Sequence, residues 1–156
     1  MASSIQDRLD QLGLVLPGPY LPHEPLDAVV VWGNRARTSG QLPRDDTGTL
    51  VHPGVLGIDV TIDEGTEAAR WCALNALSVL HAELGDLDRI VRVLSVLGFV
   101  ASVPGFVSQP AVVDGASALL HDVFGPAGRH SRSAVGVAAL PRGGAVEIEV
   151  EVALLD

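Results

Sequence analysis

The segment 129-RHSRSAVGVAALPRGGAVEIEVEV-152 decides the fold that this sequence predicts. Each of its halves alternates between apolar residues and polar or small ones, which is the pattern of β-strands with one buried face. Between the halves stands Pro141-Arg142-Gly143-Gly144, a run of turn-forming residues. The segment therefore predicts a β-hairpin whose strands are antiparallel neighbours, with Leu140 facing Ala145.

The register of this hairpin assigns each residue to a face, because side chains alternate along a strand. One face is apolar and should lie against helices; it carries Ser133, Val135, Val137, Ala139, Val146, Ile148, Val150 and Val152. The other face carries Arg132, Ala134, Gly136, Ala138, Glu147, Glu149 and Glu151. Its carboxylates suit solvent, whereas its small side chains suit the close approach of another subunit. Because small and charged positions segregate by strand, the pattern favours a subunit interface.

The part of the chain before residue 61 predicts one helix and several short strands. Ser3 to Leu12 predicts a short helix that ends at Gly13, and the proline-rich stretch 17–25 predicts an extended arm. Strands are expected over three short runs: Ala28–Trp32, Arg35–Thr38 and Thr49–His52. The first two should form a hairpin around the turn Gly33-Asn34.

Two long helices and a central strand are expected in the middle of the chain. Thr61 or Asp63 should cap the first helix, which ends at Gly85. Residues 90–100 are almost continuously apolar, as in a central strand covered on both faces. Residues 109–124 predict the second helix. The result is a single domain over residues 1–156, in which a mostly antiparallel sheet carries two long helices on one face, an α+β fold.

Composition excludes several classes of function. The chain has 156 residues, a net charge of −9 and no lysine, so neither lysine-bound pyridoxal phosphate nor a nucleic acid partner is expected. Cys72 is the one cysteine, which excludes an internal disulfide. The five histidines lack ligand spacing, so we expect no metal and no other cofactor. Without a leader or a membrane-spanning run, the chain is expected to be cytoplasmic, with no membrane partner.

Several motifs resemble the RidA/YjgF family. They include Thr38-Ser39-Gly40-Gln41-Leu42-Pro43, Ala68-Ala69-Arg70-Trp71-Cys72-Ala73-Leu74-Asn75-Ala76-Leu77, Ser131-Arg132-Ser133-Ala134-Val135 and Val146-Glu147-Ile148-Glu149. The motifs occur in family order and cover about residues 28–152. Val113-Asp114-Gly115-Ala116-Ser117 and Gly128-Arg129-His130 resemble a divergent branch of the family with a longer N-terminal arm, which here is residues 1–27, the helix and the proline-rich stretch.

The resemblance implies a homotrimer of the chorismate-mutase-like fold, in which the sheets pack into a central barrel and ligand clefts lie between subunits. It implies hydrolysis of reactive 2-imino or 2-enamino acids to 2-oxo acids and ammonia without a cofactor. The family's carboxylate-binding arginine falls on Arg132, its serine–glycine pair beside the substrate on Ser39 and Gly40, and its water-associated glutamate on Glu147. A planar guanidinium holds a carboxylate by two parallel hydrogen bonds.

Three positions depart from the family pattern. Leu26 stands where the family has a tyrosine, Asp114 where it has an asparagine and Ala134 where it often has a cysteine. An ionised Asp114 would disfavour a carboxylate ligand at the same site. In the hairpin register, Arg132 lies roughly 20 Å along the strand from Glu147 at ~3.3 Å per residue, so different subunits would supply the two.

A second reading of the same residues stays open. A trimer that only binds a small carboxylate metabolite, or one that acts on another pathway intermediate, would need the same arginine and the same cleft. A nuclease is the least favoured class, because the chain is acidic and has no lysine.

Overall fold

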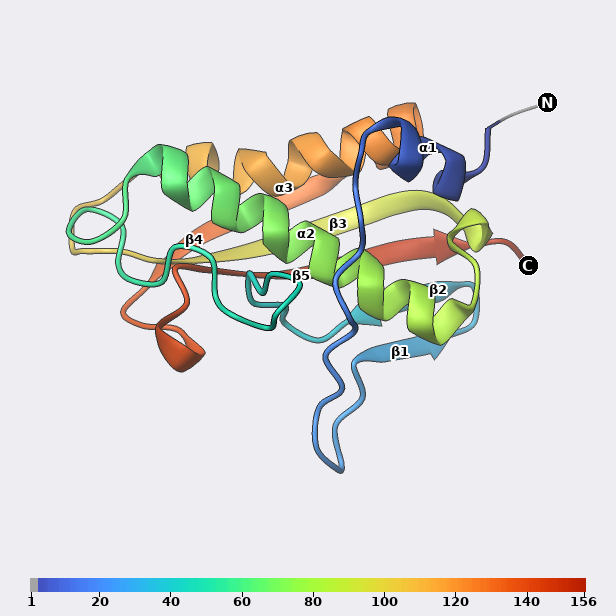
Figure 1. The fold of residues 1–156 in the computed structure, drawn as a ribbon, viewed down its shortest axis with the longest axis horizontal. Helices are drawn as coiled ribbons and strands as arrows, with labels where there is room; N and C mark the ends of the chain where they lie inside the picture. Colours follow the sequence, from blue (N-terminus) through green and yellow to red (C-terminus); the bar gives the residue numbers. More distant parts are fainter. Residues whose placement is uncertain (1–2) are drawn as a thin grey trace.

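The computed structural model describes residues 3–156, and within them one five-stranded sheet has the order β1-β2-β5-β3-β4. The strands are β1 (Val29–Trp32), β2 (Arg35–Thr38), β3 (Ile90–Ala101), β4 (Ser131–Val137) and β5 (Val146–Leu154). The helices are α1 (Ile5–Gln11), α2 (Ile62–Leu84) and α3 (Gln109–Phe124). Figure 1 shows α2 and α3 side by side over one face of the sheet. The predicted α+β fold is confirmed.

Local signals placed the helices and the first hairpin correctly. Thr61 caps α2 by accepting the backbone N–H of Glu64, whose carboxylate accepts the N–H of Thr61 in return. Gly85 ends the helix in a left-handed conformation at φ 78°. In the first hairpin, β1 and β2 pair with Val29 opposite Thr38. These elements depend on contacts a few residues apart, which a sequence pattern records directly.

The predicted C-terminal hairpin is wrong. Strand β3 lies between β4 and β5, pairing in parallel with β4 and antiparallel with β5. Arg132 therefore lies opposite Val96, whereas the predicted hairpin register would have put it near Ala153 of β5. The helix α3 provides the long crossover that a parallel β3–β4 pair requires. Alternation assigns side chains to faces within one strand, but it does not say which strand lies alongside.

The corrected pairing also reverses the faces of β4. Arg132, Ala134 and Gly136 lie on the helix side, whereas Ser133 and Val135 lie on the open face with the β5 glutamates. A Cβ on Gly136 would come within 2.8 Å of the Gln109 side chain, at the start of α3. The small residues of β4 therefore make room for α3, and the prediction that they face another subunit is wrong.

Two further expectations about strands need correction. Thr49 to His52 forms no strand; only an isolated bridge joins Arg44 to Leu50. In β3, Leu97 and Phe99 are only partly buried, since helices cover the opposite face alone. The central position predicted for β3 is correct, but a single chain covers one of its two faces.

The N-terminal arm crosses the outside of α2 before it turns toward β1 (Figure 1). The hydroxyl of Ser78 on α2 donates a hydrogen bond to the Pro17 carbonyl, which ties the arm to the helix. Upstream, the N–H of Ile5 donates to Asp88 at 2.7 Å and the side chain of Arg8 donates to the Asp122 carbonyl at 2.7 Å. The arm is thus anchored before it reaches the edge of the sheet. None of the helices in residues 3–156 combines the length and the apolar character needed to cross a membrane.

Candidate functional site

The structure divides the predicted site residues into two groups. Ser39, Gly40 and Glu147 line one cavity of about 320 Å³, and Leu26 lies in its wall. Arg132 and Asp114 lie apart from this cavity, at the contact between β4 and α3. Ala134 is partly buried against the hydrophobic core beneath the same helix. Each chain therefore carries two partial sites.

Glu147 is the acidic group of the cavity. It projects from β5 onto the open side of the sheet, opposite Phe99, and is half-buried. Burial raises the pKa of its carboxyl group, and the negative charge of Glu149 raises it further, whereas Arg44 partly offsets both. A carboxyl group tuned in this direction exchanges protons closer to neutral pH than an ordinary glutamate does.

Gly40 leaves the space that the Glu147 carboxyl group occupies. A Cβ added to Gly40 would lie 2.1 Å from Oε1 of Glu147, far inside any permitted contact. The turn brings the two residues together because the N–H of Gln41 donates to the Ile148 carbonyl at 2.8 Å and the N–H of Ile148 donates back at 3.1 Å. The glycine predicted from the sequence therefore serves to admit the carboxylate.

Ser39 and Gln41 complete this wall of the cavity. The hydroxyl of Ser39 donates to the Asp27 carbonyl at 2.6 Å, which fixes its side chain. The side-chain amide of Gln41 donates to the Ser39 carbonyl at 3.1 Å. Its Oε1 is buried and, among residues 3–156, accepts no hydrogen bond. Buried acceptors are normally satisfied, so this one marks a polar position that a ligand or a water molecule would complete.

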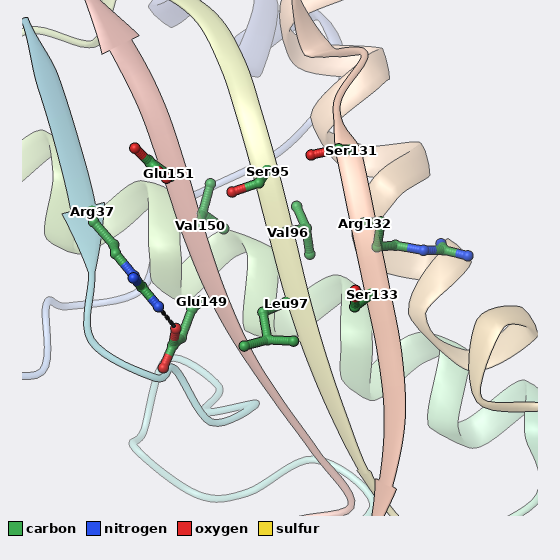
Figure 2. A pocket seen from close by; sticks show the side chains of 10 residues that line it. All are labelled: Arg37, Ser95, Val96, Leu97, Ser131, Arg132, Ser133, Glu149, Val150 and Glu151. Atoms are coloured by element: carbon green, nitrogen blue, oxygen red, sulfur yellow. Dashed lines mark hydrogen bonds and ion pairs between the residues drawn. The ribbon is translucent and has the colours of Figure 1, made fainter.

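Arg132 is held by α3. Its Nη1 donates to Oδ1 of Asp114 at 2.8 Å and to Oγ of Ser117 at 3.1 Å. Ser117 in turn contacts Nε2 of His130 at 2.9 Å. Figure 2 shows the Arg132 side chain extending from β4 toward the helix, away from the glutamates of β5. Arg132 and Glu147 therefore lie on opposite faces of the sheet, with β3 between their strands.

Figure 2 also shows a second hollow, on the open face of the sheet. The charged residues that line it are paired: Arg37 binds Glu149, and Glu151 lies 3.4 Å from Arg35 beside the hollow. Arg132 also lines it, but its side chain extends toward α3 and binds Asp114. The hydrogen bond to Glu149 raises the pKa of Arg37. Serines of β3 and β4 make up much of the rest. With its charges neutralised, this hollow offers no reactive group.

Sequence reasoning missed three residues of the first cavity: Tyr20, Arg44 and Arg142. The guanidinium carbon of Arg44 lies 3.9 Å from the centre of the Tyr20 ring, within the range of a cation–π contact. Arg44 follows the motif of residues 38–43 directly, and this proximity was the one available signal. Nothing in the composition of the arm singles out Tyr20.

The buried cysteine and the metal-ligating residue types are placed as follows. Cys72 is fully buried, and burial raises the pKa of its thiol well above the ordinary value, which makes a reactive thiolate unfavourable. Within residues 3–156, no three side chains of histidine, cysteine, aspartate or glutamate gather where they could hold a metal ion.

Known proteins with a similar sequence or fold cover almost the whole chain. The family model described as "YjgF/chorismate mutase-like, putative endoribonuclease" matches residues 6–147. Protein TCP17 of Trypanosoma cruzi is 46% identical over 147 residues, which are 94% of this chain and 91% of that protein. The structure of Atu1372 from Agrobacterium tumefaciens, 42% identical, superposes with a TM-score of 0.89 over 98% of this chain and 94% of its own. A structure from Shewanella oneidensis MR-1, titled a "putative endoribonuclease", is 32% identical, with a TM-score of 0.93 over 97% and 100%.

Proposed function

Because the chain belongs to the YjgF/chorismate mutase-like family, we propose that it hydrolyses reactive 2-imino or 2-enamino acids to 2-oxo acids and ammonia in a cleft between subunits. The observation that carries this proposal is the half-buried carboxyl group of Glu147, which lies in a cavity beside Ser39 and Gly40. Burial raises its pKa, which suits a group that must both accept and return a proton.

The reaction needs one carboxyl group and one water molecule. Ionised Glu147 orients the water and takes a proton from it as its oxygen forms a bond to the iminium carbon. The product of this step is a carbinolamine. The carbon–nitrogen bond then breaks as the proton held by Glu147 passes to nitrogen, and the carbonyl double bond forms as the hydroxyl proton returns to the freed carboxylate. Ammonia and the 2-oxo acid leave, and ammonia takes the remaining proton from Glu147 as ammonium. No electrons are exchanged, so the reaction balances with water alone.

Arg132 is the proposed anchor for the carboxylate of the substrate, supplied by the neighbouring subunit of a homotrimer. The assignment follows the resemblance to the family at residues 131–135. It needs a neighbour because Arg132 and Glu147 lie on opposite faces of one chain. Among the described residues, the Arg132 guanidinium donates hydrogen bonds only through Nη1, so Nε and Nη2 keep donors for a ligand.

The open face of the sheet supports an assembly of several chains. Val30 and Trp32 of β1 are exposed there, Trp32 to 86%. The ion pairs Arg37–Glu149 and Arg35–Glu151 neutralise the charges beside them. Apolar surface with internally balanced charge can be buried at low electrostatic cost, which fits the proposed barrel of three sheets.

A small-molecule-binding trimer without catalysis is the second candidate, and one contact favours it. The Asp114 carboxylate already occupies part of the Arg132 guanidinium, so the anchor is partly neutralised within its own chain. Leu26 in the cavity wall also lacks the hydroxyl group that a tyrosine would bring. Either change weakens the hold on an imino acid while the cleft itself remains.

Relatives of this chain are described as endoribonucleases, and the charge of this chain argues against that activity here. With a net charge of −9 and no lysine, the chain would repel a phosphate backbone over most of its surface. Incubation with labelled RNA provides the check: cleavage that survives in Arg132→Ala and Glu147→Gln would point to a separate nuclease site.

The decisive experiment measures ammonia and 2-oxo acid release from imino acids generated in place by an amino-acid oxidase. We expect release above the buffer rate for the wild type, and a loss of roughly 100-fold or more for Glu147→Gln, the range of one acid–base group. Arg132→Ala should lose a similar amount. Arg92→Gln, which changes an exposed arginine away from both partial sites, is the matched control. A wild type that accelerates no imine would leave the binding trimer as the function.

A further inference from the structure

The cavity of Glu147 also gathers two arginines and a tyrosine that the proposed reaction does not use. Arg44, Arg142 and Tyr20 all line it. The guanidinium carbons of Arg44 and Arg142 lie 3.9 Å and 6.0 Å from the centre of the Tyr20 ring. An aromatic face contacts the flat side of a guanidinium, so the N–H groups at its edge stay available to an anion.

Arg44 is a half-buried cation that, within residues 3–156, makes no direct ion pair with Glu147, the carboxylate of its cavity. Within residues 3–156, its guanidinium takes part in no ion pair and no hydrogen bond. Burial lowers its pKa, and the nearby positive charge of Arg142 lowers it further. A charge removed from water needs an opposite charge close by, and two neighbouring cations need it more.

The local charge of the cavity is opposite to that of the whole protein. Glu147 is the one carboxylate among its lining residues, against two arginines, whereas the chain carries a net charge of −9. Glu147 is also the group whose pKa burial raises, which reduces its ability to neutralise Arg44. The unsatisfied Oε1 of Gln41 in the same wall is an acceptor, so it would receive a donor group of the ligand and not the anionic group. Such a cavity is suited to a ligand that brings negative charge.

The backbone conformation of Arg142 also supports a ligand at this cavity. Arg142 has φ 58° within the turn Pro141–Gly143, a left-handed conformation that residues with a Cβ rarely adopt. Glycine would relax this position, yet the chain carries a long cationic side chain there, near Tyr20. Unfavourable backbone at a cavity wall is common where a side chain serves a ligand.

We propose that Arg44 and Arg142, arranged about Tyr20 of the N-terminal arm, form an anion-binding subsite that takes a second acidic group of the ligand. The inference rests on the proposed function in assigning the first acidic group, beside the reacting carbon, to Arg132. The ligand class is then a 2-imino or 2-oxo acid with a carboxylate or phosphate group at the far end of its side chain. The arm, which precedes the motif of residues 38–43, supplies the aromatic ring.

Calorimetric titration of the full chain tests this subsite with three probes. The probes are 2-oxobutanoate with one acidic group, 2-oxoglutarate with two carboxylates, and 3-phosphohydroxypyruvate, a 2-oxo acid with a carboxylate and a phosphate. We expect at least one two-acid probe to bind about 10-fold more tightly than 2-oxobutanoate, the effect of one charge-assisted contact. The two-acid probe that binds more tightly identifies the second acidic group as a carboxylate or a phosphate.

Substitutions test whether the two arginines cause the higher affinity for a two-acid probe. Arg44→Gln should abolish the advantage of the two-acid probe, and Arg142→Gly should reduce it, while Arg92→Gln should leave it unchanged. Arg142→Gly places glycine at a left-handed position in an exposed turn, so it should fold even if Arg44→Gln does not. Affinity for 2-oxobutanoate should stay within about 3-fold in each variant, since its carboxylate is assigned to Arg132.

Equal affinities for the three probes, or an advantage that survives both Arg44→Gln and Arg142→Gly, would overturn the subsite. Failure of the proposed function has a different signature. A chain that prefers a two-acid probe through Arg44, yet releases ammonia from no imine, keeps the subsite and loses the hydrolysis.

Discussion

Nη1 of Arg132 lies 2.8 Å from Oδ1 of Asp114, and this ion pair joins the edge strand β4 to the helix α3 within one chain. The Asp114 carboxylate is 67% exposed and the Arg132 side chain 21% exposed, so the pair sits at the rim of the helix–sheet contact. The guanidinium group that is proposed to bind a substrate carboxylate therefore already binds a carboxylate of its own chain. Several consequences of this geometry can be measured.

Asp114→Asn should strengthen the hold of Arg132 on a carboxylate ligand. The change removes a competing negative charge and keeps a hydrogen-bonding oxygen of the same shape, so KM for an imino acid should fall several-fold with kcat little changed. The free energy of unfolding should fall by no more than about 1 kcal/mol, since exposed ion pairs contribute little to stability. Asp122→Asn, at another exposed position of α3, is the control. An unchanged KM would show that Arg132 does not contact the substrate.

Gly40→Ala should inactivate the site without unfolding the protein. The new Cβ would lie 2.1 Å from Oε1 of Glu147, and the end of that side chain can rotate away more easily than the backbone can. We expect ammonia release to fall by roughly 100-fold, as for loss of the carboxyl group itself. The melting temperature should barely change.

Gly18→Ala is the matched control for this substitution, since Gly18 has an ordinary φ and no heavy atom within 4 Å of an added Cβ. Retention of full activity in Gly40→Ala would mean that the observed position of the Glu147 carboxyl group is not the active one.

Glu147→Gln should stabilise the protein at neutral pH and leave it unchanged in acid. Burial raises the pKa of Glu147 above its ordinary value of 4.5, so the unfolded chain ionises first as the pH rises. The stability associated with its protonated form is fully present below about pH 4.5 and is lost as the pH passes the folded-state pKa. Glutamine does not ionise and avoids this loss.

Melting curves of both proteins between pH 4 and pH 8 provide the measurement. The difference in melting temperature should be near zero at pH 4 and should grow in favour of the variant toward pH 8. Glu83→Gln, at an exposed position near the end of α2, should show no such trend. A wild type more stable than the variant at pH 8 would contradict the direction of the pKa shift.

Mixing two inactive variants should restore activity if neighbouring subunits share each cleft. Arg132→Ala and Glu147→Gln each remove a different half of the site. In trimers reassembled at random from equal amounts, about one quarter of the clefts combine an intact Arg132 with an intact Glu147. Ammonia release should therefore recover to about one quarter of the wild-type rate.

Light scattering of the wild type should give three times the chain mass. Recovery to the wild-type rate is impossible on this arrangement, and an absence of recovery in mixed trimers would show that neighbouring subunits do not combine Arg132 and Glu147 in one cleft.

Most of the fold could be predicted because its signals are local. The Thr61 cap, the Gly85 stop and the Gly33-Asn34 turn each act over a few residues, and α2, α3 and the β1–β2 hairpin follow from them. The C-terminal hairpin could not be predicted in the same way. Strands β4 and β5 both alternate as the two strands of a hairpin would, but β3 lies between them and pairs with each. Pairing between strands that are distant in the sequence depends on which strand edges are still unpaired once the helices have packed on the sheet.

The same limit applied to the site. The motif of residues 38–43 identified Ser39 and Gly40, and the alternation of β5 put Glu147 on the correct face. The face of Arg132 was predicted incorrectly, because it follows from the parallel register with β3. Tyr20 could not be found from the sequence, since its place depends on the path of the whole arm across α2.

The sequence by itself determined the helices, the first hairpin, the family and the motifs that contain Ser39, Gly40 and Glu147. Each of these depends on contacts between near neighbours or on a run of residues that can be matched directly. Tertiary structure alone decided that β3 separates β4 from β5, that Arg132 is tied to Asp114, and that two arginines meet over Tyr20. Those relationships join residues far apart in the chain, and only the packing of the helices on the sheet brings them together.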